Sequence, residues 1–172
     1  MPLPRDVLDL LLVPTDPALL PDPAAIERLF DRWQERGLLA PGTGPLRRTA
    51  GPRAWGLLPG GFGTLWLDRP PGEVLYANQQ GGFRVLCPDC GANLVPAFQA
   101  AVRARREGRS ERVRCACGLD EDVVRLPLLP PGAFARGALI LGDVQGLDPV
   151  PGALVEVEGI LGSVRVLARR RA

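Results

Sequence analysis

Four cysteines are the residues of this chain whose type and spacing could do chemistry. They form two pairs, Cys87 with Cys90 and Cys115 with Cys117, and 24 residues (91–114) separate the pairs. The chain contains no histidine, so a site for a zinc ion would use the thiolates. Zn²⁺ binds four such ligands in a tetrahedron, and two short chelating pairs supply them with little loop-closure cost. The spacing therefore predicts one structural Zn²⁺ ion held by all four cysteines.

The second cysteine pair is one residue shorter than the first, and an extended backbone would accommodate this spacing. Residues i and i+2 of a strand point to the same side. A strand over residues 112–117 would therefore place Val113, Cys115 and Cys117 on one face, and Gly118 would provide the following turn. We expect both sulfurs of this pair to reach the same ion.

Four cysteines also have three other common uses. Disulfides belong mainly to secreted proteins, and we expect none here because no secretion signal is recognisable. A redox-active C-x-x-C usually lies at a helix N-terminus, and an iron–sulfur cluster also takes four thiolates; both alternatives stay open. Zinc closed in by four thiolates has no free position for water or substrate, so it would stabilise the fold rather than do chemistry.

The first pair lies in the stretch CPDCG at residues 87–91. This stretch resembles the metal-binding knuckle of zinc-ribbon proteins, and the resemblance covers residues 83 to 126. It implies a structural zinc ion, although the second pair departs from the C-x-x-C-G that zinc ribbons usually repeat. The layout of strand–helix–strand ends around a four-cysteine insert also resembles a family of small uncharacterised bacterial proteins, some of which carry an ABC-transporter ATPase label. The chain has no G-x-x-x-x-G-K-[ST] motif, so we expect no nucleotide to bind.

The residue types that are missing limit catalysis more than those present favour it. Without histidine and lysine, the commonest general bases and Schiff-base chemistry are absent. All 21 basic residues are arginine, and the net charge of +2 neither favours nor opposes a nucleic-acid partner. We predict that the protein is not an enzyme.

A basic stretch lies between the two cysteine pairs. Residues 103–114 contain six arginines and two glutamates, and such a stretch could bind phosphates or an acidic protein. Acidic residues follow at 120–122 and few aromatic residues are interleaved, so base stacking is poorly supported and a purely solvated helix face stays a third possibility. The candidate contacts are Arg103, Arg106, Arg109 and Arg112.

The N-terminal half predicts a strand, a helix and a loop. Residues 7–13 are almost all apolar, which is typical of a strand buried on both faces. A helix follows between the capping residue Asp22 and Gly37. Residues 40–63 are rich in Gly, Pro and Arg and predict a long connection. The buried stripe of the helix consists of Ile26, Leu29, Phe30 and Trp33.

The next segments alternate between strand and helix patterns. Residues 64–68 and 73–78 flank the turn sequence RPPG and predict a hairpin. In the cysteine region we expect strands over residues 83–87, 112–117 and 122–128, and a helix over residues 96–107. Strand patterns at 138–141 and 163–168 flank residues 150–161, where VEVE alternates as in a strand but the spacing of the larger apolar residues favours a helix.

Together these elements predict an α+β fold. We expect a small mixed or antiparallel sheet of ferredoxin-like type, with about two helices on one face and an inserted zinc ribbon. Residues 1–82 and 129–172 would form the α+β domain, and residues 83–128 the insert. No stretch approaches the ~20 apolar residues that span a bilayer, so we expect a cytoplasmic protein without membrane contact.

The function that these features favour is a non-enzymatic, zinc-stabilised protein that binds another protein, as an adaptor, regulator or neutralising factor. The first alternative is a nucleic-acid-binding accessory protein that uses the basic stretch. The second alternative is a thiol redox protein.

Overall fold

The computed structural model describes residues 7–109 and 111–171 of the chain, and it confirms the α+β class with a mainly antiparallel sheet. The helices are α1 (Pro23–Glu35), α2 (Val95–Arg106) and α3 (Pro151–Leu161), with 3₁₀ turns η1 (Ala54–Gly56) and η2 (Val123–Arg125). The strands are β1 (Val7–Pro14), β2 (Leu39–Gly44), β3 (Arg47–Ala50), β4 (Thr64–Asp68), β5 (Val74–Tyr76), β6 (Arg84–Val85), β7 (Arg112–Arg114), β8 (Asp120–Asp122), β9 (Leu128–Leu129), β10 (Ala133–Ala135), β11 (Ala138–Gly142) and β12 (Val164–Arg171).

Six strands form the main sheet in the order β12-β1-β11-β4-β3-β2, and every neighbouring pair is antiparallel. β1 is therefore parallel to β4, and β11 is parallel to β12. The chain passes through α1 in the first case and through α3 in the second. This is the split βαβ arrangement of ferredoxin-like folds, and the β2–β3 hairpin extends it at one edge.

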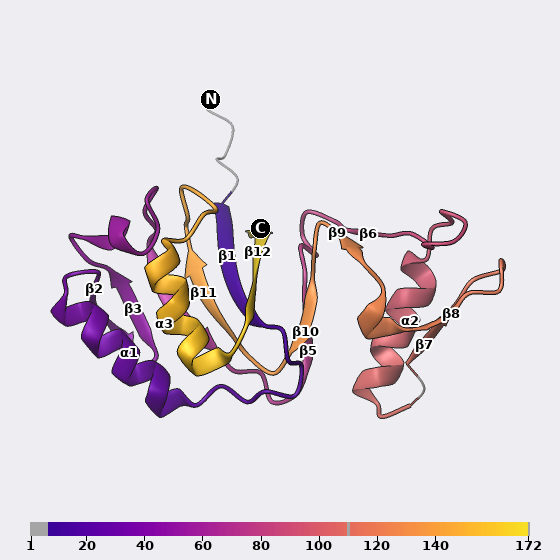
Figure 1. Cartoon of the computed structure of the whole chain (residues 1–172), viewed down its shortest axis with the longest axis horizontal. Coiled ribbons are helices and arrows are strands. Elements are labelled where there is room, and N and C mark those ends of the chain that lie inside the picture. The colour runs from indigo at the N-terminus through magenta and orange to yellow at the C-terminus, as the bar shows by residue number, and fades with distance from the viewer. Residues whose placement is uncertain (1–6, 110, 172) are drawn as a thin grey trace.

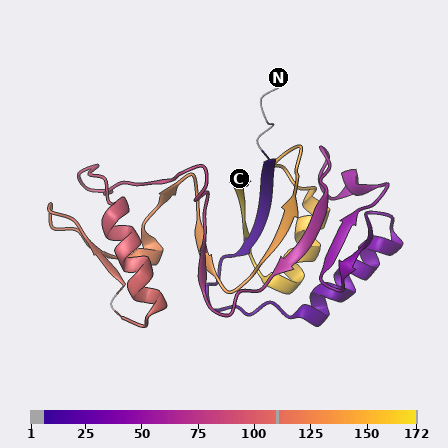
Figure 2. The same cartoon turned by 180° about the vertical axis from the view of Figure 1, so that it is seen from behind.

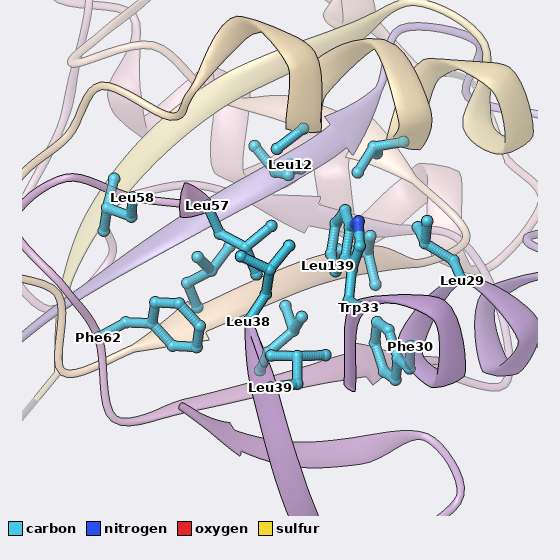
Figure 3. Close-up of a cluster of buried hydrophobic side chains, with 14 of the residues drawn as sticks. Leu12, Leu29, Phe30, Trp33, Leu38, Leu39, Leu57, Leu58, Phe62 and Leu139 are labelled. Atoms are coloured by element: carbon cyan, nitrogen blue, oxygen red, sulfur yellow. The ribbon is translucent and has the colours of Figure 1, made fainter. Parts of the chain in front are cut away.

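Helix α1 covers one face of this sheet together with α3 (Figure 1). The Asp22 side chain accepts a hydrogen bond from the Ala24 backbone N–H, which caps α1, and Gly37 follows the helix with a φ of 73°. The predicted stripe of α1 is buried against leucines of the central strands and of the loops beside them (Figure 3). α1 thus forms because its apolar spacing matches the sheet face that it covers.

Residues 150–161 adopt the helical alternative, as α3. Ala153, Val157 and Leu161 recur every four residues and are buried in the same core as α1. Val155, which made the segment alternate like a strand, is 67% exposed on the outer side. Burial of one helical stripe therefore outweighs the strand-like pattern.

A buried carboxylate lies on the opposite face of the sheet. Asp9 of β1 is fully buried and stands directly across from Arg169 of β12. The Arg169 guanidinium donates to Asp9 Oδ2 at 3.2 Å, and Arg171 Nη2 lies 3.4 Å from Asp9 Oδ1. Arg171 also bonds to the exposed Asp143 at 2.6 Å. This charge cluster joins the edge strand β12 to its neighbour β1 and to the residue that follows β11.

The cysteine region lies beyond a two-stranded ribbon of β5 and β10 (Figures 1 and 2). The predicted hairpin of residues 64–68 with 73–78 is wrong, because β4 pairs with β3 and β11 whereas β5 pairs with β10. The RPPG segment leads the chain out of the main sheet instead of folding it back.

A separate apolar cluster fills the region beyond the ribbon. Phe98 and Val113 are among its most deeply buried residues, and its members run from Leu75 to Phe134. This range is wider than the insert of residues 83–128, whose boundaries stay a prediction. The strand expected over residues 122–128 is also wrong, since η2 breaks it and only β8 and β9 remain extended.

Residues 40–63 are not the long connection that their composition suggested. They contain the β2–β3 hairpin and η1. Glycine makes this path possible at Gly51, where a Cβ would lie 2.4 Å from the Gly37 carbonyl oxygen. Among the described residues, no helix combines the length and apolar character needed to cross a membrane.

Candidate metal centre

The first cysteine pair lies in a tight turn at the end of β6. The Cys87 N–H donates to the Ala92 carbonyl at 2.8 Å, and the Gly91 N–H donates to the Cys87 carbonyl at 2.8 Å. Gly91 has a φ of 74°, in the left-handed region that glycine adopts without steric penalty. The sequence CPDCG therefore folds into a turn that directs both sulfurs to one side.

The second pair lies in the turn between β7 and β8, and not on a strand as predicted. β7 ends at Arg114. The Cys115 N–H then donates to the Leu119 carbonyl at 2.9 Å and the Gly118 N–H to the Cys115 carbonyl at 3.0 Å. Gly118 has a φ of 103°, so each pair is followed by a glycine in a left-handed conformation. The C-x-C spacing reflects a turn one residue shorter than the first.

The structure brings all four predicted sulfurs together, and each lies within 4.8 Å of the others. Cys87 Sγ is 3.6 Å from Cys117 Sγ, and Cys90 Sγ is 3.6 Å from Cys115 Sγ. All four cysteines are free thiols, since a disulfide bond would place two sulfurs at ~2.05 Å. The four thiols can therefore act as ligands of one metal ion.

The pKa values of the cysteine thiols differ between the two turns. Burial acts to raise the pKa of Cys87, but hydrogen bonds from the backbone N–H groups of Cys90 and Asp89 and from the Cys117 thiol lower it to about 7. For Cys117, the backbone N–H of Leu119 acts to lower the pKa, whereas the Cys87 thiol and burial raise it to about 12. Cys87 is therefore the first thiolate available to an incoming metal ion.

This asymmetry predicts how metal binding depends on pH. Thiols must lose their protons to bind, so affinity falls as the pH drops through about 7 and Cys87 becomes protonated. Above that pH, Cys87 is ionised but Cys117 still carries a proton that the metal must displace. Calorimetric titrations of Zn²⁺ in buffers of different ionisation enthalpy should therefore count more protons released per ion below pH 7 than above it. A constant or opposite count would contradict this order of ionisation.

The four arginines proposed as partner contacts fall into two groups. Arg109 bonds to Glu107 through its Nε at 2.7 Å, and Arg112 bonds to Asp120 at 2.6 Å. Arg103 and Arg106 are exposed on the last turns of α2, and within residues 7–109 and 111–171 neither makes an ion pair. Among the residues that the structure describes, two of the four arginines therefore have no carboxylate partner.

Three acidic residues neutralise this stretch, and the sequence did not show which arginine each of them pairs with. Arg105 is held by Glu73 and Glu111, and Arg112 and Arg114 share Asp120. The hydrogen bond from Arg112 lowers the pKa of the Asp120 carboxyl. Glu73 is 32 residues from Arg105, so only the packing of the ribbon against α2 reveals this pair. Asp120 follows from the β7–β8 register, which pairs Arg114 with it.

Comparison of the chain with protein-family models, with curated proteins and with solved structures found no match. The interpretation of the four-cysteine cluster therefore depends on the geometry of the cluster itself.

Proposed function

We propose that this protein is a non-enzymatic, zinc-stabilised protein that binds another protein. The observation that carries the proposal is the convergence of four thiols, from two turns far apart in the sequence, to within 4.8 Å of one another. Zinc would join these turns and fix the insert in one conformation.

The spacing of the sulfurs supports a single tetrahedral ion. With metal–sulfur bonds of ~2.3 Å, the sulfurs of a tetrahedral site lie about 3.8 Å apart. Two of the separations here are 3.6 Å and none exceeds 4.8 Å, so small adjustments would seat one Zn²⁺ ion. An iron–sulfur cluster uses several iron atoms and separates its thiolates further, which makes it the weaker choice.

A structural role follows from the ligand set. Four thiolates complete the coordination of zinc, so neither water nor substrate has a position on the ion. The insert is small, and small units with limited cores commonly depend on a metal for stability. Because the metal binds only the folded arrangement, its binding energy would stabilise the insert directly.

The charge distribution favours a protein partner over nucleic acid. Nucleic-acid affinity grows with the number of phosphates that cations neutralise. In the basic stretch, Arg105, Arg109 and Arg112 are already paired with carboxylates of this chain. A short acidic segment of a protein needs fewer free arginines than a run of phosphates.

The proposal is tested by asking whether binding to a protein depends on zinc. The full chain, zinc-loaded, and its Cys90→Ser variant would be used to recover partners, and each recovered protein would be purified and titrated against both. We expect direct binding to the zinc-loaded chain that falls at least about tenfold for the variant. Recovery of RNA or DNA with a steep salt dependence would support the nucleic-acid alternative instead, and partners held by mixed disulfides would support thiol redox chemistry.

A further inference from the structure

Helix α2 borders an open groove that none of the metal chemistry uses. The groove lies between α2 and the segment that joins β5 to β6, and its volume is about 410 Å³. Two helix residues one turn apart, Arg103 and Arg106, line it. Its size falls in the range of pockets that hold a ligand or a few peptide side chains.

The base of the groove is apolar. Leu75, Phe98 and Val102 line it and belong to the buried core of the insert. Phe83, which is only partly buried, packs edge-on against Phe98 with ring centroids 5.9 Å apart. The groove can therefore accept an apolar side chain against a rigid surface, with part of an aromatic ring still available for contact.

The rim of the groove carries positive charge, and no carboxylate stands among the described residues that line it. Its lining includes Arg103 and Arg106 but no aspartate or glutamate. Arg105, one position away, does not line this groove and is neutralised by Glu73 and Glu111. Free guanidinium groups beside an apolar surface favour a carboxylate, which they bind through two parallel hydrogen bonds.

A second hollow continues the groove along the helix. It has a volume of about 490 Å³ and shares Leu75, Val102 and Arg106 with the first. Glu73 and Arg105 also line it, and they form an ion pair with each other. The combined surface is longer than one side chain requires, so it suits an extended segment of several residues.

From these observations we infer that this groove, the α2 groove, binds a short extended acidic segment of a partner protein. An aliphatic or aromatic side chain of the segment would lie against Phe83 and Val102, and flanking carboxylates would pair with Arg103 and Arg106. The inference rests on the proposed function and names the class of partner. Single-stranded nucleic acid fits less well, because the groove offers one partly exposed aromatic ring, that of Phe83, and two arginines, whereas such binding uses a longer basic track and stacks several successive bases.

The test uses a phage-displayed library of random octapeptides selected on the zinc-loaded full chain. We expect the selected peptides to be enriched in aspartate and glutamate around one aromatic or aliphatic residue. A synthetic peptide of the consensus should bind the Arg103→Glu/Arg106→Glu variant at least about tenfold more weakly, because like charges would then face each other. The Arg103→Gln/Arg106→Gln variant, which keeps a good helix former at both positions, should also bind more weakly.

The matched control is Arg109→Glu, since Arg109 is exposed, basic and close in sequence but lies outside the groove. Its peptide affinity should stay within about twofold of the parent chain. Failure of the selection, a consensus without acidic residues, or equal binding by the double variant would overturn the inference. Zinc content and circular dichroism of each variant separate the two proposals. A zinc-loaded, folded chain that selects no acidic peptide contradicts the α2 groove alone, whereas a chain that binds no zinc contradicts the proposed function.

Discussion

Replacing Cys90 with serine is expected to weaken zinc binding more than about a hundredfold and to unfold the insert. Loss of a residue that only orients a ligand already reduces metal affinity 10–100-fold, and Cys90 would itself be a ligand. Cys90 is exposed, so the substitution removes almost no packing. Any large loss of stability must therefore come from the metal.

The measurement combines zinc content, helical circular dichroism and limited proteolysis of residues 83–128. Asp89→Ser is the matched control, because it introduces the same residue at an exposed position of the same turn. We expect this control to keep its zinc. In excess chelator, Cys90→Ser and the parent chain should become equally susceptible to proteolysis. If Cys90→Ser stays zinc-loaded and folded, or if it remains less stable than the chelated parent, the metal is not what holds the insert.

Replacing Asp9 with asparagine is expected to lower the free energy of unfolding of the main sheet by about 3 kcal/mol. The substitution keeps the size of a fully buried side chain but removes the charge that Arg169 and Arg171 neutralise. Breaking a buried ion pair is costly because charge is left without its partner. Here both guanidinium groups are partly exposed. Water can therefore solvate them in the variant, which limits the loss of free energy of unfolding.

Asp143→Asn provides the control for Asp9→Asn, since it makes the same chemical change at another partner of Arg171. Asp143 is exposed, and its φ of 57° is one that asparagine tolerates well. We expect a loss below about 1 kcal/mol there. Urea unfolding followed by tryptophan fluorescence suits both variants, because Trp33, Trp55 and Trp66 all lie outside residues 83–128. Equal effects of the two substitutions would contradict a structural role for the buried carboxylate.

The ferredoxin-like core could be predicted because its signals are local. The apolar run of β1 and the capped, periodic α1 each carry their own pattern within one segment. The order of the four core strands then follows from the antiparallel preference of such a sheet and its two helical crossovers. Residues 150–161 were harder, since alternation and helical spacing overlap there and only burial of Val157 and Leu161 decides between them.

The pairing of β5 with β10 could not be predicted in the same way. Residues 74–76 and 133–135 are almost sixty positions apart, and both flank the insert. A turn signal such as RPPG indicates that the chain changes direction, but it does not identify the strand that pairs next. The hairpin prediction therefore failed where the partner of a strand was set by the path of the whole insert.

For the candidate site, the sequence identified the four candidate ligands but not the backbone that positions them. The spacing of the cysteines was enough to predict that Cys87, Cys90, Cys115 and Cys117 lie together, as they do in the structure. The turn at Cys115 depends on the β7–β8 register and on the left-handed Gly118, which an alternating pattern over residues 112–117 conceals. Which arginines form ion pairs could also be seen only in the structure, because acidic partners such as those of Arg105 and Arg112 come from other elements.

X-ray absorption at the zinc edge of the purified full chain tests the central claim most directly. The account predicts about one zinc per chain with four sulfur neighbours at ~2.3 Å and no oxygen or nitrogen in the first shell. A chain purified without chelator that contains no zinc, or a first shell that includes a solvent oxygen, would contradict a closed four-thiolate site.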